Sequence, residues 1–390
     1  MFAFAAVLAA APLAIAIYAY VGYPLVLLVI ATLRPRRIDT VAGAPWPTVT
    51  VTVPVYNAAS KIRGTLEGIL QLDYPRALLQ VLVISDASTD GTDIVVREFA
   101  GRGVELLRLQ RRIGKTAAEN AALSVARGEI IVNVDATILV PPGSLKPLVR
   151  VFDDPTIGVS SGRDVSVGDT SQSETGAESS YTGYEMWIRD LETRVGSIVG
   201  ASGCFYGIRR SIHAKALPTG LSWDFASPLV AQKQGYRSVS VPAAVCIVPR
   251  TAEIRTEITR KVRTMARGLR TLFYLRALMN PMRYGSFALM LISHKLLRWV
   301  PYLLAPISFA ALCLLAAQSV IARMLLGIVI GGLLVGTVGV YRRRSAASTP
   351  IALAGFAVAV LAAGIRAWWD ALRQTQTATW EPTPRPGAQT

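Results

Sequence analysis

Side chains that form disulfides or bind zinc are scarce in this chain. Its 390 residues include three cysteines and two histidines. Cys204, Cys246 and Cys313 are widely spaced, which excludes a disulfide framework and the paired spacing of a zinc site. His213 and His294 also lack metal-ligand spacing. We therefore expect buried thiols, histidines at surfaces or interfaces, and no zinc-type centre.

Acidic residues are also few, and they are unevenly distributed. Asp and Glu number 25 against 41 Lys and Arg, which gives a net charge of +16. Residues 1–33 contain no charged side chain and residues 297–370 contain almost no acids, whereas 45–290 has the mixed composition of a globular domain. With 52% hydrophobic residues, the chain is too apolar for an ordinary soluble enzyme. The composition predicts an N-terminal anchor, a central globular domain and a C-terminal membrane block.

The first 33 residues are long enough to cross a membrane, because a helix rises ~1.5 Å per residue and the hydrocarbon core is ~30 Å thick. The alternative, a secretory signal peptide, would begin with a basic region, have a shorter apolar core and end at small residues. The run ends instead at Arg34-Pro35-Arg36-Arg37. We predict an N-terminal transmembrane helix over 1–33. The positive-inside tendency keeps the Arg cluster, and with it the central domain, in the cytoplasm.

Three more apolar runs follow the central domain. They cover 299–320, 323–340 and 350–369. We predict about three transmembrane helices within 299–370, followed by a tail at 371–390. The cluster Arg342 to Arg344 separates the last two runs and is expected in the cytoplasm. The third run is either a crossing or a re-entrant or interfacial helix.

Basic residues gather beside the apolar runs and within 251–298. In 254–279, apolar residues recur at helical spacing among Arg and Lys, as they do in helices that lie on a membrane surface. We therefore predict amphipathic interfacial helices over 251–298, with anionic membrane lipids as their partner. Nucleic acid is not an expected partner, since no nucleic-acid-binding motif is present.

Strand-like and helix-like segments alternate in the central domain. The strand-like segments are Thr48 to Val53, Val81 to Ile84, Val104 to Leu109 and Glu129 to Val134, and the helical ones cover about 59–71, 90–101 and 115–127. This alternation predicts an α/β domain with a mostly parallel sheet. Ligands of such sheets bind beyond the carboxyl ends of the strands. Asn57, Asp86 and Asp135 stand at those positions.

Short polar motifs follow the strands in a fixed order. They are Pro54-Val55-Tyr56-Asn57, Ser85-Asp86-Ala87-Ser88-Thr89-Asp90-Gly91-Thr92, Gly114-Lys115 with Asn120, Val134-Asp135-Ala136-Thr137, Gly200 to Arg210, and Trp223-Asp224-Phe225. Over about 48–270 the chain resembles family 2 glycosyltransferases with the GT-A fold, and its flanking helices resemble those of membrane-bound bacterial polysaccharide-type members. The resemblance implies a Rossmann-like GT-A domain over 45–250 at the bacterial inner membrane.

The resemblance also implies that a nucleotide sugar binds at the first motifs, with UDP as the expected nucleotide. The residues it assigns to substrate binding are Pro54, Tyr56, Asn57, Asp86, Lys115 and Asn120. Carboxylate and amide oxygens suit this role, because leaving base or ribose donors unpaired in a pocket costs ~1–3 kcal/mol each. Taken alone, Asp86 to Thr92 is equally a turn with a helix cap. Asp90 is interpreted mainly as that cap.

Asp135 matches the first aspartate of the family's Asp-x-Asp motif, which ligates a divalent metal that bridges the diphosphate. Mg²⁺ or Mn²⁺ suits such a site, because a hard cation can be held by one or two carboxylates with phosphate and water oxygens. Thr137 stands where the family has its second aspartate. A neutral hydroxyl is a weaker ligand, so the site would rely more on phosphates, water or another side chain.

Asp224 stands where the family places its catalytic base. There it would take the proton of the acceptor hydroxyl during an inverting displacement of the diphosphate. The family has a second acid just before this position, and this chain has Trp223. The alternative is that Asp224, after Ser222, only caps a helix that runs to Gln234.

Arg260 to Thr264 lies where polysaccharide synthases carry Gln-x-x-Arg-Trp. Arg263 keeps the arginine of that motif, whose forked donors can bind a diphosphate. The missing Gln and Trp argue against processive synthesis. The alternative role of this stretch is contact with the lipid surface.

The resemblance thus implies a metal-dependent, inverting membrane glycosyltransferase that transfers a sugar to a lipid-linked or growing glycan acceptor. The departures at Thr137, Trp223 and Arg260 to Thr264 motivate a second hypothesis. In it, the chain is a catalytically weak family member that serves as a subunit of a polysaccharide synthesis or export complex.

Overall fold

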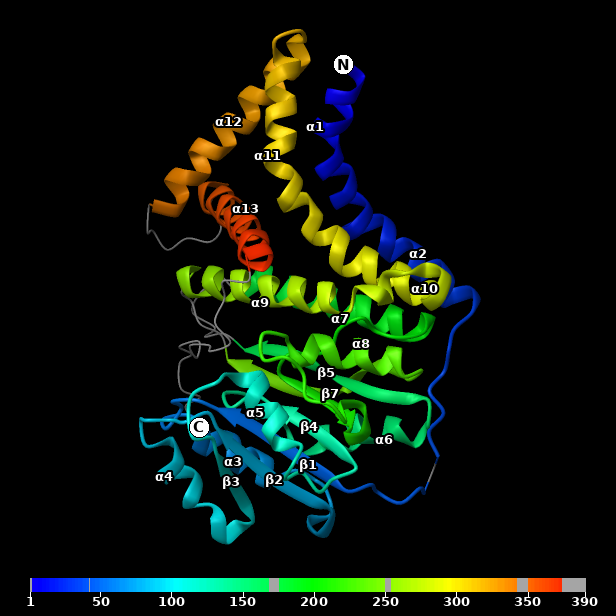
Figure 1. The fold of residues 1–390 in the computed structure, drawn as a ribbon, viewed down its shortest axis with the longest axis vertical. Coiled ribbons are helices and arrows are strands. Elements are labelled where there is room, and N and C mark those ends of the chain that lie inside the picture. Colours follow the sequence, from blue (N-terminus) through cyan, green and yellow to red (C-terminus); the bar gives the residue numbers. More distant parts are fainter. Residues whose placement is uncertain (1, 42, 168–174, 250–253, 342–349, 374–390) are drawn as a thin grey trace.

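The computed structural model describes residues 2–41, 43–167, 175–249, 254–341 and 350–373. The predicted Arg342 to Arg344 cluster and the tail beyond residue 373 lie outside these ranges. The central domain is one sheet with helices on both faces, and the apolar helices extend from one side of it (Figure 1).

Within the described residues, the sheet has seven strands in the order β3-β2-β1-β4-β6-β5-β7. Their bounds are β1 Val49–Val55, β2 Leu79–Ser85, β3 Val104–Arg108, β4 Ile130–Val134, β5 Ile157–Val167, β6 Phe205–Arg209 and β7 Arg237–Pro249. Strands β1 to β4 are mutually parallel, β5 is parallel to β7, and β6 runs antiparallel to β4 and β5. The predicted mostly parallel α/β sheet is confirmed.

Strand β1 lies inside the sheet, between β2 and β4, and contains a proline, which cannot donate to a neighbouring strand. Pairing between β1 and β4 ends at Thr52. The carbonyl of Val55 accepts from the amide of Asp86 at 2.8 Å, so Pro54, one residue before, faces the β4 side. Its missing N–H therefore costs no ladder bond, and the strands diverge here at the edge where ligands are expected.

Helices of the domain connect these strands. They are α3 Ile62–Leu70, α4 Thr92–Arg97, α5 Lys115–Ala122, α6 Leu145–Arg150, α7 Thr175–Val195 and α8 Trp223–Lys233. The helices predicted over 90–101 and 115–127 are shorter than expected. Helix α4 gives way to a 3₁₀ turn at Ala100–Arg102. Beyond α5 the hydroxyl of Ser124 donates to the carbonyl of Ala121 at 2.8 Å, a local bond that competes with helix continuation.

In the part of the chain that the structure describes, four helices are long and apolar enough to span a membrane. The first, Phe2–Leu33, joins α1 Phe2–Ile17 and α2 Tyr23–Leu33 through a π turn, and the second, Pro281–Ala316, joins α10 Pro281–Leu291 and α11 Leu297–Ala316 through the π turn Ile292–Leu296. The others lie in α12 Val320–Tyr341 and α13 Pro350–Arg373. The run predicted to begin at 299 therefore continues a helix that starts at Pro281, within the region predicted to be interfacial.

Helix α9, Ile254–Tyr274, lies between the domain and the apolar helices (Figure 1). Leu269 of α9 packs in one cluster with Trp368 of α13. The indole N–H of Trp368 donates to the carbonyl of Trp299 at 2.8 Å. A Cβ on Gly268 would lie 2.7 Å from the Trp299 ring, so glycine permits the close approach of α9 and α11. Helix α9 is thus held between the sheet domain and the apolar helices.

The expectations for His213, Cys204 and Cys313 need correction, whereas those for His294 and Cys246 agree with the structure. His213 is buried in the domain beside Trp223, with ring centroids 4.2 Å apart, and is not at a surface or interface. His294 is buried where the apolar helices meet α7, as expected for an interface. Cys246 is buried, whereas Cys204 is half-buried and Cys313 is exposed on α11.

Candidate active site

Two non-glycine residues with left-handed backbone follow adjacent strands of the sheet. Asn57, after β1, has φ of 46°, and Ala87, after β2, has φ of 57°. Asn57 Oδ1 accepts from the amide of Thr89 at 2.8 Å, which joins the two loops. The Tyr56 ring lies 3.9 Å from the Arg112 guanidinium. Strained backbone of this kind persists where surrounding contacts define one conformation, and it clusters at functional sites.

Asp86 follows β2 and is 2% exposed. Its two carboxylate oxygens accept from the amides of Ile113 and Gly114, at 2.7 and 2.8 Å. Gly114 has φ of 107°, a conformation that favours glycine. Asp86 therefore holds the loop that leads into α5. Its predicted contact with a base or ribose stays a prediction.

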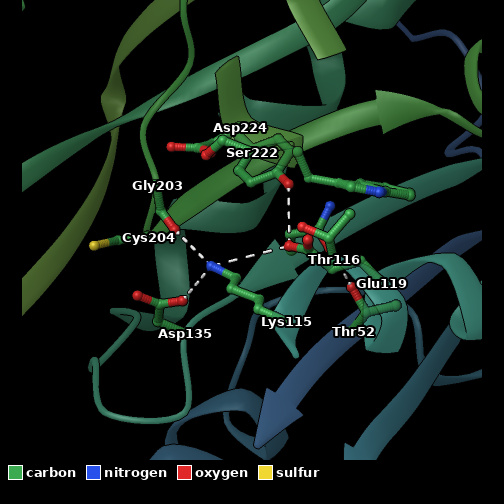
Figure 2. Close-up of polar contacts among 12 residues, drawn as sticks. Thr52, Lys115, Thr116, Glu119, Asp135, Gly203, Cys204, Ser222 and Asp224 are labelled. Carbon is green, nitrogen blue, oxygen red and sulfur yellow. Dashed lines mark hydrogen bonds and ion pairs between the residues drawn. The ribbon is translucent and has the colours of Figure 1, made fainter. Parts of the chain in front are cut away.

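Lys115 is the first residue of α5, and its ammonium lies among three oxygens from different elements (Figure 2). Nζ is 2.6 Å from Asp135 Oδ1, 3.1 Å from the carbonyl of Gly203 and 3.9 Å from Glu119 Oε1. Burial alone would lower the pKa of Lys115, but Asp135 and Glu119 hold it above its ordinary value. The structure thus joins Lys115 and Asp135, two of the predicted site residues, at the carboxyl edge of the sheet.

Glu119 lies one turn after Lys115 and is 1% exposed, and the sequence analysis did not select it. Burial raises the pKa of Glu119 to about 8, against the opposing effect of Lys115. Tyr206 donates to Oε1 at 3.4 Å, and Oε2 has no hydrogen-bond partner within the described residues. Its i,i+4 spacing from Lys115 was the one available signal.

Asp224 lies in the first turn of α8 and faces the same region. The Ser222 hydroxyl donates to Asp224 Oδ1. A Cβ on Gly203 would lie 3.1 Å from Asp224 Oδ2, so the Asp224 carboxylate lies beside Gly203, whose carbonyl accepts from Lys115. Within the described residues, the side chain of Ser222, the N-cap residue of α8, makes no capping hydrogen bond. These contacts place Asp224 beside the Lys115 and Asp135 pair, and its role as base or as helix cap stays a prediction.

Helix α9 adds an arginine to the site that the sequence analysis missed. Burial lowers the pKa of Arg267, and Glu119 and Asp224 act in the opposite direction, which places its guanidinium near both carboxyl groups. Arg263 lies one turn earlier on the same helix. Residues four apart share a helix face, and that spacing was the signal for Arg267.

The domain has known relatives. Residues 50–217 match the sequence profile of the family described as Glycosyl transferase family 2. The chain contains a family 2 glycosyltransferase domain. Its fold is similar to that of a mannosyltransferase from Pyrobaculum calidifontis, solved in complex with GDP-Man and Mn²⁺, with a TM-score of 0.73 and 24% identity over 96% of this chain and 99% of that one. The predicted GT-A fold is confirmed.

Two relatives that match this domain in sequence are named for different glycosyl-transfer reactions. An N-acetylglucosaminyltransferase of Mesorhizobium japonicum is 27% identical over 237 residues, which are 55% of this chain and 55% of that protein. A beta-monoglucosyldiacylglycerol synthase of Nostoc sp. is 26% identical over 181 residues, 45% of this chain and 39% of that protein. The chain spans about half the length, or less, of these relatives.

Asn120 of the family 2 domain is bonded within the chain. Its side chain donates to the carbonyl of Leu217 at 2.7 Å and accepts from the indole N–H of Trp223 at 3.0 Å. Trp223, in the place of the family's second acid, is 2% exposed and part of the core. Asn120 and Trp223 therefore fix the start of α8, and with it Asp224, against α5. A contact of Asn120 with substrate stays a prediction.

The predicted metal position of the family 2 domain offers one carboxylate. The Asp135 side chain is 27% exposed, and among the residues that the structure describes no three His, Cys, Asp or Glu side chains form a metal-binding group. Asp135 nevertheless holds a cation, since the Lys115 ammonium is 2.6 Å away. This donor set fits Mg²⁺ or Mn²⁺ with phosphate and water oxygens as its other ligands.

Proposed function

We propose that this chain is an inverting membrane glycosyltransferase that transfers a sugar from a nucleotide sugar, with UDP as the expected nucleotide, to a lipid-linked or growing glycan acceptor. One observation carries the proposal. The Lys115 ammonium donates to the carbonyl of Gly203, and the Asp224 carboxylate lies beside the same glycine. The carboxylate of Asp135, which is paired with that ammonium, and the carboxylate of Asp224 therefore lie close together. Positive charge beside Asp135 suits a diphosphate leaving group, and the Asp224 carboxylate suits an attacking hydroxyl that must lose its proton.

Asp224 is the proposed base. Its carboxylate would accept the proton of the acceptor hydroxyl as that oxygen attacks the anomeric carbon, and the hydrogen bond from Ser222 orients it. Lys115, Arg263 and Arg267 supply positive charge for the departing diphosphate. Asp135 would hold Mg²⁺ or Mn²⁺, which neutralises charge on the diphosphate when bound.

The donor assignment has support from the strand-end loops. The Pro54 to Asn57 loop and the Asp86 loop are joined through Asn57 and Thr89, and the Tyr56 ring stacks on the Arg112 guanidinium beside them. The Pyrobaculum enzyme was solved with GDP-Man and Mn²⁺, which supports a nucleotide sugar and a divalent ion. UDP is favoured by the family resemblance of these motifs alone.

The acceptor assignment follows from the membrane helices. Among the described residues, four helices that are long and apolar enough to span a membrane flank the domain, and α9 lies between the domain and α13 (Figure 1). The Nostoc relative is named for a glycosylated diacylglycerol. We place the chain in the bacterial inner membrane, with the domain on the cytoplasmic side near Arg34 to Arg37.

The test is a transfer assay with the detergent-solubilised full chain. UDP- and GDP-sugars are supplied singly with Mn²⁺ and a bacterial lipid extract, and sugar incorporation into lipid and polymer fractions is measured. Incorporation from one donor, abolished by EDTA, is the expected result. Nucleotide binding without transfer from any donor would instead support the subunit hypothesis that Thr137 and Trp223 motivate.

A further inference from the structure

The Lys115 ammonium lies beside Asp135, at the place where a metal ion would bind if Asp135 is its ligand. Nζ lies 2.6 Å from Asp135 Oδ1 (Figure 2). A divalent cation on the same oxygen would stand close to the ammonium, and two positive charges repel at such separations. Lys115 therefore competes with a metal ion for Asp135 Oδ1.

Glu119 offers a place for the displaced ammonium. Oε1 is 3.9 Å from Nζ, so a shift of about 1 Å brings the pair to a charge-assisted hydrogen bond. Oε2 is buried and has no partner within the described residues. Buried carboxyl oxygens are normally hydrogen-bonded, and Lys115 is the cation nearest to Glu119 on α5. Glu119 thus has a buried oxygen without a partner within the described residues, Oε2, on the carboxyl group whose other oxygen lies 3.9 Å from Lys115 Nζ.

We propose that Lys115 is a movable internal cation, which neutralises Asp135 before the donor binds and shifts onto Glu119 when a divalent ion takes its place. Glu119 is then a positioning residue, because it acts on the metal site only through Lys115. The inference rests on the proposed function in one respect, namely that Asp135 is a metal ligand.

The test is a double-mutant cycle on Mn²⁺ binding, measured from the free-Mn²⁺ EPR signal with the full chain in detergent and no nucleotide. Lys115→Met removes the competing cation, so Mn²⁺ should bind about tenfold more tightly, the equivalent of ~1.4 kcal/mol. Glu119→Gln removes the second acceptor, so Mn²⁺ should bind about tenfold more weakly. In the double variant the effect of Glu119→Gln should disappear, because no ammonium needs to relocate.

Several outcomes would overturn the proposal. Weaker or unchanged Mn²⁺ binding by Lys115→Met contradicts displacement. An equal loss from Glu119→Gln with and without Lys115 shows that Glu119 acts directly on the ion. Glu98→Gln is the matched control, since Glu98 is exposed and pairs with Arg63, and it should bind Mn²⁺ like the wild type. Because no sugar or acceptor is present, failure of this cycle is distinct from failure of the transfer assay.

Discussion

The hydroxyl of Tyr23, on the first apolar helix, donates a 2.6 Å hydrogen bond to Oε1 of Glu192 on α7. His294, on the second apolar helix, lies 2.6 Å from the same oxygen. Burial would raise the pKa of Glu192, but His294 and Tyr23 hold it below its usual range. One buried carboxylate therefore joins two apolar helices to the family 2 domain.

Removal of that carboxylate should destabilise the whole chain. Glu192→Ala leaves Tyr23 and His294 without their shared partner, and we expect a loss of about 3–5 kcal/mol, the usual cost of breaking a buried charged network. Tyr23→Phe removes one hydrogen bond and should cost only about 1 kcal/mol. Thermal unfolding in detergent checks both. Equal unfolding midpoints for the two variants would show that Glu192 does not link these helices.

Acid should destabilise the domain through His213. Burial lowers the pKa of His213 from 6.5 to about 4, and Nε2 bonds to Ser227 Oγ at 2.8 Å. Between these pH values the unfolded chain binds a proton at His213 and the folded chain does not. The contribution of neutral His213 to the free energy of unfolding is therefore fully present above pH 6.5 and is lost as the pH falls toward 4. The loss should reach about 3 kcal/mol.

A comparison of wild type with His213→Gln isolates this effect from the other titrating groups. The unfolding midpoint of the variant should fall less steeply between pH 6.5 and 4.5 than that of the wild type. Parallel curves would mean that His213 already takes up its proton in the folded state.

Asp224→Asn should lower transfer by about 10²–10⁴-fold, the range expected for loss of a general base. Asparagine keeps the size of the side chain and its ability to accept from Ser222, so nucleotide affinity should change little. Transfer rate and nucleotide affinity are measured on the same preparation. A near-normal rate in this variant would remove Asp224 from the chemistry.

Cytoplasmic orientation predicts where trypsin can cut in sealed vesicles. Arg36 and Arg37 lie in an exposed segment between the first apolar helix and β1. Trypsin should cleave the chain there in inverted inner-membrane vesicles. In right-side-out vesicles the same site should stay uncut until detergent is added. Cleavage only in right-side-out vesicles would place the domain on the outer side, away from cytoplasmic nucleotide sugars.

The sequence by itself determined the α/β domain, the apolar helices and the order of the polar motifs, because each depends on residues close together along the chain. Hydrophobic period and strand-end position identify β1, β2 and β4 without knowledge of any distant contact. Strand-end position also selected Asp135, whereas the roles of Lys115 and Asp224 were implied by the resemblance of their motifs to family 2 glycosyltransferases.

Only the tertiary structure decided which of these side chains meet. The contacts of Lys115 with Asp135 and Gly203, and the approach of Arg267 to Glu119 and Asp224, join segments far apart in sequence. Local pattern carries no information on such pairings, because burial and charge neutralisation act in space and not along the chain. The same reason explains why Trp223 proved to be a core residue that anchors Asn120, and why His213 is buried rather than exposed.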